Sequence, residues 1–142
     1  MTLAVLHLRA DPALVVPRAT AAGAEVRLRI FSGLCVVGWE NGKRSYFELG
    51  APAPERLGFY VPDAGPLDAS WSMNAWAELS MTQLVQPANQ RSMHPVYGVD
   101  EVSVQLVDDA GHGGRWPYVW FVVLGGEPMQ LRYRVTVTEP TG

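Results

Sequence analysis

The spacing of apolar and polar residues predicts two neighbouring strands near the end of the chain. Residues 116–124 read W-P-Y-V-W-F-V-V-L, and such a run is typical of a strand that is covered on both faces or lies at an interface. Residues 129–138 instead alternate between apolar and polar side chains, as in a half-buried strand. The glycines and proline of residues 125–128 are typical of a turn, so we predict a hairpin.

The register of this hairpin predicts a contact surface. If the two strands pair from the loop outward, Trp120 faces the core, while Phe121 lies opposite Arg132 and Val119 lies opposite Arg134. An apolar strand beside a cationic one is what a buried interface with charge-assisted contacts presents, although arginine stems that cover apolar surface on a monomer explain the pattern equally well. If the interface interpretation is right, Phe121→Glu should dissociate an oligomer and leave a folded monomer.

Asn41 and Gly42 form the strongest local signal, because this dipeptide favours a type I′ turn. The turn predicts a hairpin in which residues 34–40 pair with 43–49, and in which Trp39 meets Arg44 in a cation–π contact.

Further strands are predicted wherever apolar residues alternate with polar ones. In residues 25–31, Val26, Leu28 and Ile30 are expected to face the core. In residues 71–82 the odd positions are apolar and the even ones polar except for Trp76, which predicts a long strand with Trp76 on its polar face. Shorter strands are expected at residues 2–9, 14–16, 57–61 and 101–107.

Nine or ten short strands, regular turns and no substantial helix predict an all-β protein. We expect a single antiparallel β-sandwich, jelly-roll-like, in which residues 1–142 form one domain. Residues 86–98 are polar and contain prolines, so they are expected to form a long loop or arm, with Gln90, Arg91 and His94 as candidate contacts.

The composition of the chain indicates which classes of partner it can bind. The chain has 142 residues, of which 48% are hydrophobic and 18% charged, with a net charge of −3. A charge-poor surface favours association with proteins, and a slightly acidic chain is not expected to bind nucleic acid by neutralising phosphates. No apolar run is long enough for a membrane span, and the N-terminal residues do not resemble a signal peptide, so we expect synthesis in the cytoplasm.

The sequence contains no complete catalytic or metal-binding motif. The Gly111–Gly114 segment contains His112 and resembles an oxyanion loop, but a G-x-S-x-G nucleophile is missing and glycines are what a tight turn requires, so we expect a simple turn. The three histidines lack metal-site spacing, and Asp108 with Asp109 lacks the remaining ligands of a calcium loop. Cys35 faces Glu48 in the predicted hairpin, which is a weak hint of a nucleophile and base. We therefore expect no catalytic residue, metal or cofactor.

These observations favour a non-catalytic structural protein. We expect it to form a homo-oligomer, with a trimer favoured, and to pack on a larger protein shell, for example as a capsid decoration on a virion. The residues expected to bind partners are Val119, Phe121, Arg132, Arg134, Trp76, Trp39 and Arg44.

Two other functions stay open. A carbohydrate-binding module would stack sugars on Trp39, Trp76 and Trp116, and it requires at least two tryptophans on one exposed face. A small β-barrel enzyme would enclose an apolar cavity on which His94, Glu48 or Asp100 converges.

Overall fold

The computed structural model describes residues 3–19, 25–39, 55–67, 74–84, 98–124 and 129–140. Strands make up most of these residues, and one 3₁₀ turn, η1 (Ala110–His112), joins two of them. The strands in this part of the chain are β1 (Leu3–Ala10), β2 (Leu14–Ala19), β3 (Glu25–Trp39), β4 (Glu55–Tyr60), β5 (Asn74–Leu84), β6 (Gly98–Asp109), β7 (Gly114–Leu124) and β8 (Met129–Pro140).

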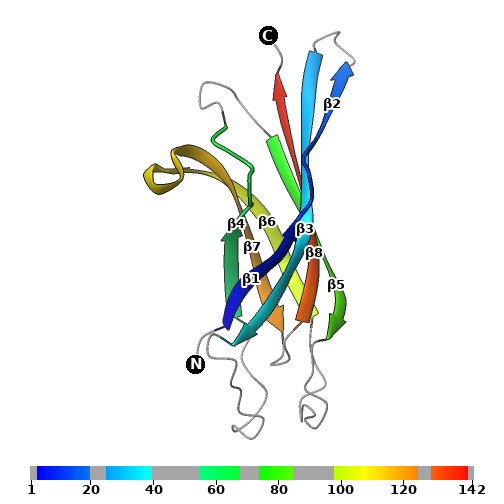
Figure 1. Ribbon diagram of the computed structural model, residues 1–142, viewed down its shortest axis with the longest axis vertical. Helices are drawn as coiled ribbons and strands as arrows, with labels where there is room; N and C mark the ends of the chain where they lie inside the picture. Colours follow the sequence, from blue (N-terminus) through cyan, green and yellow to red (C-terminus); the bar gives the residue numbers. More distant parts are fainter. Residues whose placement is uncertain are drawn as a thin grey trace, which may run out of the picture.

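The strands form two antiparallel sheets (Figure 1). Sheet A has the order β1-β3-β8-β5, with β2 also paired to β3, and sheet B has the order β4-β7-β6. At the lateral edges β5 packs beside β6 and β1 beside β4, which brings the two sheets together around a common core. The prediction of a nearly all-β protein with antiparallel sheets is confirmed, and this arrangement fits a β-sandwich.

Strand β3 is longer than predicted and fills the middle of sheet A. It joins two predicted segments into one strand that pairs with β8 from Val26↔Pro140 to Val37↔Met129. Its other edge pairs with β2 and then with β1. Residues 33–37 therefore have both edges occupied, and the predicted pairing of residues 34–37 with 46–49 is wrong because a strand has only two edges. Residues 40–54, which include Arg44, lie outside the described ranges.

The core side of β3 is the opposite of the one predicted. Phe31, Cys35 and Val37 are buried, whereas the face that carries Val26 and Ile30 is the outer, half-buried face of sheet A. The pairing with β8 decides which alternate residues of β3 face the core, because buried residues of β8 lie opposite Phe31 and Cys35 in the ladder. Alternation alone shows that two faces differ, and the partner strand decides which one is buried.

Two arginines of β3, which the prediction placed on the solvent face, instead lie on the core side and contact a glutamate of β8. Arg27 Nη2 lies 2.8 Å from Glu139 Oε1, and Arg29 Nε lies 3.6 Å from the same oxygen. Glu139 is only 3% exposed, so the two guanidinium groups offset the cost of burying its carboxylate. Arg29 also lies over the ring of Phe31, 5.3 Å from its centroid.

Strands β7 and β8 are consecutive in sequence but lie in different sheets. The predicted hairpin, with Phe121 opposite Arg132 and Val119 opposite Arg134, is therefore wrong. Val119 and Phe121 are fully buried between the sheets, while the two arginines are exposed on the outer face of sheet A. Trp120, predicted to be core, is half-buried on the outer face of sheet B.

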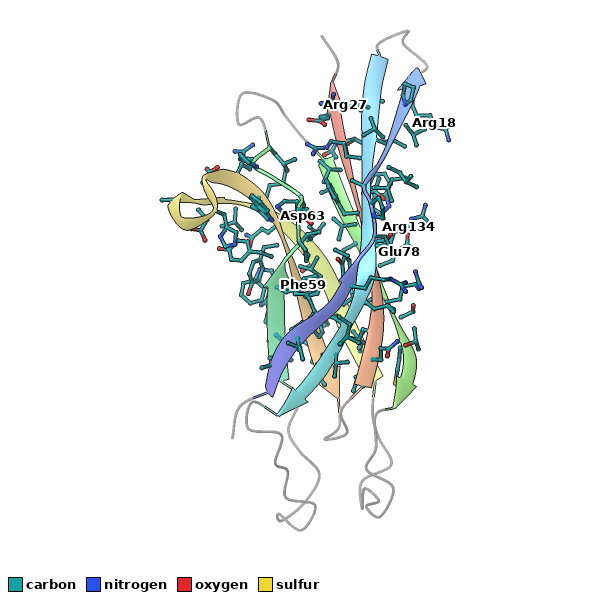
Figure 2. All side chains as sticks on the ribbon, in the orientation of Figure 1. Arg18, Arg27, Phe59, Asp63, Glu78 and Arg134 are labelled. Carbon is teal, nitrogen blue, oxygen red and sulfur yellow. The ribbon has the colours of Figure 1, made fainter. Side chains whose placement is uncertain are left out.

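Aromatic contacts join the two sheets at the centre of the core. Figure 2 labels Phe59 on β4. Its ring lies 6.0 Å from Phe121 and 5.3 Å from Tyr133 on β8, measured between centroids. His7 on β1 completes this group, with its ring 5.1 Å from Phe59. On β5, Ala75, Ala77 and Leu79 pack against the core, and Trp76 points outward, as the alternation predicted. Such rings bury large areas, so they stabilise the contact between the sheets.

The burial of Phe121 makes it a test of core packing. We expect Phe121→Ala to lower the free energy of unfolding by about 3–5 kcal/mol, because the lost ring leaves a cavity between the sheets. Urea denaturation measures this loss. As a control, Ser103→Ala at an exposed position on the outer face of sheet B should cost at most about 0.5 kcal/mol. Equal losses in the two variants would contradict the assigned core. The earlier expectation for Phe121→Glu is reversed, since an unpaired carboxylate at this position should unfold the chain.

Candidate binding faces

The outer face of sheet A, called face A below, presents an apolar row across four strands. The register places Leu14, Ile30, Thr136 and Trp76 side by side in this order. Leu14 is 60% exposed and Trp76 46% exposed, whereas Thr136 between them is buried. The row therefore exposes apolar side chains at both ends, with the polar Thr136 buried between them.

Two arginines lie on one side of this row on β8. Arg134 stands in the ladder between Ser32 and Glu78, and Figure 2 labels Arg134 and Glu78 close together on sheet A. Arg132 Nη1 lies 3.9 Å from Asp11 Oδ2, an oxygen that also accepts a hydrogen bond of 3.1 Å from the Ser32 hydroxyl. A shallow groove of about 390 Å³ runs along this region and is lined by Leu14, Ile30, Ser32, Arg132, Tyr133 and Arg134. Face A thus combines apolar side chains with charges of both signs.

The structure brings some of the predicted contact residues together and separates others. Trp76, Arg132 and Arg134 share face A, although Val119 and Phe121 are excluded because they are buried in the core. The side chain of Trp39 and the residues Arg44, Gln90, Arg91 and His94 lie outside the part of the chain that the structure describes.

The outer face of sheet B, called face B below, carries a row of touching aromatic rings. Tyr118 lies between Trp120 and Tyr60, with centroid distances of 4.6 and 4.7 Å. Tyr60 in turn stacks on His112 of η1 at 3.9 Å, and His112 lies 5.2 Å from Trp116. Trp116 and Trp120 were noticed in the sequence as aromatic residues, but Tyr60 and His112 were not expected beside them. The aromatic alternation at positions 116, 118 and 120 was the available signal.

Small residues make room for these rings. A Cβ atom at Gly58 would overlap the ring of Tyr118, and one at Gly65 would overlap Trp116. The indole nitrogen of Trp116 donates a hydrogen bond of 2.6 Å to the carbonyl oxygen of Val61. These contacts hold Tyr118 and Trp116 in defined positions against the backbone of sheet B and its neighbouring loop.

Asp109 organises one end of face B. Its Oδ1 accepts a hydrogen bond of 2.8 Å from the backbone N–H of Gly111 and thereby caps η1, while its Oδ2 accepts one from the Tyr60 hydroxyl. His112 Nδ1 lies 3.4 Å from Oδ2. The hydrogen bond from Tyr60, followed by that from Gly111, lowers the pKa of Asp109, and the same bond to Asp109 raises the pKa of Tyr60. Residues 111–114, which resemble an oxyanion loop in sequence, form part of a capped 3₁₀ turn, in which Gly113 has a φ of 81°.

Comparison with protein-family models, curated proteins and solved structures finds no match. Among the described residues, no group of three or more histidine, cysteine or acidic side chains is placed to hold a metal ion. The same residues contain no helix long and apolar enough to cross a membrane. Asp100, one of the groups considered for a cavity, is exposed on β6, while Glu48 and His94 lie outside the described ranges.

Cys35 lies in the core and pairs in the ladder with His7 on one side and Leu131 on the other. The predicted pairing with Glu48 does not apply, because both edges of β3 are occupied here. Burial raises the pKa of the Cys35 thiol to about 12. Burial also lowers the pKa of His7, so this neighbour favours its neutral form.

We expect Cys35 to resist alkylation by iodoacetamide in the folded protein at mildly alkaline pH. The thiolate is the reactive form, and the raised pKa reduces its fraction roughly a thousandfold relative to an ordinary cysteine. Mass spectrometry measures the extent of labelling, with the urea-unfolded chain as the control that should label fully. Rapid labelling under native conditions would place Cys35 outside the core.

The hydrogen bond between Tyr60 and Asp109 predicts a pH response. Tyr60 should ionise above the ordinary phenol pKa of about 10, and Asp109→Asn should lower its pKa by removing the negative charge. Because the folded-state pKa of Tyr60 is raised, its contribution to stability is present below about pH 10 and is lost as the pH rises through the folded-state value. The lowered pKa of Asp109 gives a contribution present above about pH 4 and lost as the pH falls.

Ultraviolet difference absorbance of the phenolate measures this titration. Subtracting the curve of Tyr60→Phe isolates Tyr60 from the other tyrosines. An unchanged Tyr60 titration in Asp109→Asn would show that this hydrogen bond is not formed in solution.

Proposed function

We propose that the chain is a non-catalytic assembly module that binds other protein subunits through face A. One observation carries this proposal. Among the described residues, the large apolar side chains with high exposure that the register places on an outer sheet face all lie on face A: Leu6, Leu14 and Trp76. Clustered exposed apolar residues on a protein with a well-formed core are typical of an interaction surface.

The chemistry of face A fits a protein partner. Tryptophan and arginine are enriched at the centres of protein interfaces, where a large rigid side chain or a planar guanidinium is covered on binding. Trp76 pairs with Thr136, and Glu78 pairs with Arg134. Trp76 and Arg134 are therefore diagonal neighbours on face A. Burying the exposed part of Trp76 would remove an apolar surface from water, and Arg134 would supply a directional contact.

We propose a second copy of the chain as the first partner, because face A carries complementary charges. Glu78 lies directly opposite Arg134, and Asp11 lies near Arg132. Two copies related by a two-fold axis would set cationic groups of one against acidic groups of the other. A trimer would instead place face A against a different surface of the next copy, so the measured mass distinguishes the two arrangements.

We further propose a jelly-roll-like module on a larger shell, such as a capsid decoration on a virion. The chain passes repeatedly between the sheets, from β3 to β4, from β4 to β5, from β5 to β6 and from β7 to β8. Two-sheet modules of this kind recur in capsid proteins, and the argument is one of architecture.

Light scattering of the purified chain, coupled to size-exclusion chromatography, tests the assembly. We expect an oligomer, and we expect Leu14→Glu and Trp76→Glu to shift it to the monomer mass because each places a carboxylate in the apolar row. Trp120→Ala on face B is the control and should keep the parent mass. A monomeric parent protein, or an unchanged mass in both face A variants, would overturn the proposal.

A further inference from the structure

We infer that face B is a binding surface for oligosaccharides built of uncharged pyranose rings. The inference does not rest on the assembly function, because face B lies on the opposite sheet. It rests on the aromatic row and on the polar groups that border it.

The register arranges face B in three rows across β4, β7 and β6. Arg56, Val122 and Asp100 form the first row, and Gly58, Trp120 and Ser103 form the second. The third row contains Tyr60, Tyr118 and Gln105, so it continues the aromatic band into η1. Aromatic rings therefore occupy the middle of the face, with hydrogen-bonding groups on both sides.

Trp120 is the central platform of this arrangement. The ring of Tyr118 occupies the space over its ladder neighbour Gly58, whereas Ser103 on the other side is small and raises no side chain as tall as the indole. The indole nitrogen donates a hydrogen bond of 3.2 Å to Gln105 Oε1, and the guanidinium carbon of Arg56 lies 4.8 Å from the ring centroid. These contacts orient Trp120 before any ligand arrives, which reduces the entropy lost on binding.

The polar border matches the hydroxyl groups of a sugar. Arg56 is an exposed donor on β4, and Asp100 is an exposed acceptor on β6. Beside Asp100, β6 has a bulge between Asp100 and Ser103, where Glu101 adopts a φ of 51°. Bulges often redirect side chains at binding sites. A pyranose presents C–H groups to an aromatic ring and hydroxyls at its rim, so rings flanked by donors and acceptors satisfy both parts of it.

Face B fits a saccharide better than a protein partner. No large apolar side chain of high exposure lies on this face among the described residues, in contrast to face A. The exposed positions are instead polar, at Arg56, Asp100, Ser103 and Gln105. A protein interface centred here would lack the apolar centre that such interfaces bury.

Isothermal titration calorimetry tests the inference with four soluble probes: cellohexaose, xylohexaose, mannohexaose and chitohexaose. We expect saturable binding of at least one probe by the parent protein. Trp120→Ala should weaken that binding about tenfold or more, because a stacked ring is lost. Val15→Ala, which removes an exposed apolar side chain that lies on neither face A nor face B, is the control and should bind as the parent does.

Ser103→Arg is a second variant at an exposed position that does not depend on truncating an aromatic residue. Arg56 already lies over the Trp120 ring, and a second guanidinium from β6 should cover the side of the indole that stays open, so binding should be lost while the thermal melting curve stays that of the parent. The inference is overturned if none of the four probes binds, or if Trp120→Ala and a folded Ser103→Arg bind like the parent. It is also overturned if Trp120→Ala changes the oligomer mass, since face B would then be a protein interface.

Discussion

The pairing of β3 with β8 is the constraint on which the rest of the structure depends. It joins an early strand to the last one along a ladder from Val26↔Pro140 to Val37↔Met129, and each of the two strands has further partners on its other edge. Because β3 is long, that edge accommodates β2 and β1 in succession. The ladder also sets which side chains of sheet A point inward, since a shift by one residue would exchange the core and the outer face. Its contacts are distant in sequence, so this register can form only after a large loop has closed.

Much of the local structure could be predicted from the sequence, because the alternation of apolar and polar side chains depends only on the residues of the strand itself. The segments that became β1, β2, β5 and β8 were recognised, and Trp76 was correctly placed on the outer face. The pairing of strands could not be predicted in the same way. Short connections and the Asn-Gly signal favour hairpins between neighbours, yet β7 and β8 are divided between the sheets, and both edges of β3 at Val36 are taken by β1 and β8. Those partners are determined by how two whole sheets bury their apolar faces.

The candidate faces were predictable to the extent that each depends on a single strand. Arg132 and Arg134 were correctly read as one outward row of a half-buried strand, but their expected neighbours on β7 turned out to be core residues. The aromatic band shows the opposite case. Position 118 lies between two tryptophans in the sequence, whereas its contact with Tyr60 depends on the β4–β7 register and on the absence of a side chain at Gly58. The residue pattern of β4 or of β7 alone does not predict the register between these two strands.

The two sheets divide the molecular surface into chemically different faces, and the core between them keeps the faces independent. Phe59, Phe121 and Tyr133 hold the sheets together from inside, so neither outer face has to supply this cohesion. Apolar exposure is concentrated on sheet A, while sheet B carries rings that shield one another and polar groups at its borders. Substitutions on opposite faces share no partners, so their effects should add. If face A joins copies of the chain, face B of each copy stays turned away from the contact. If face B also binds saccharides, as we infer, assembly would multiply these sites on one particle and raise their avidity without any new contact.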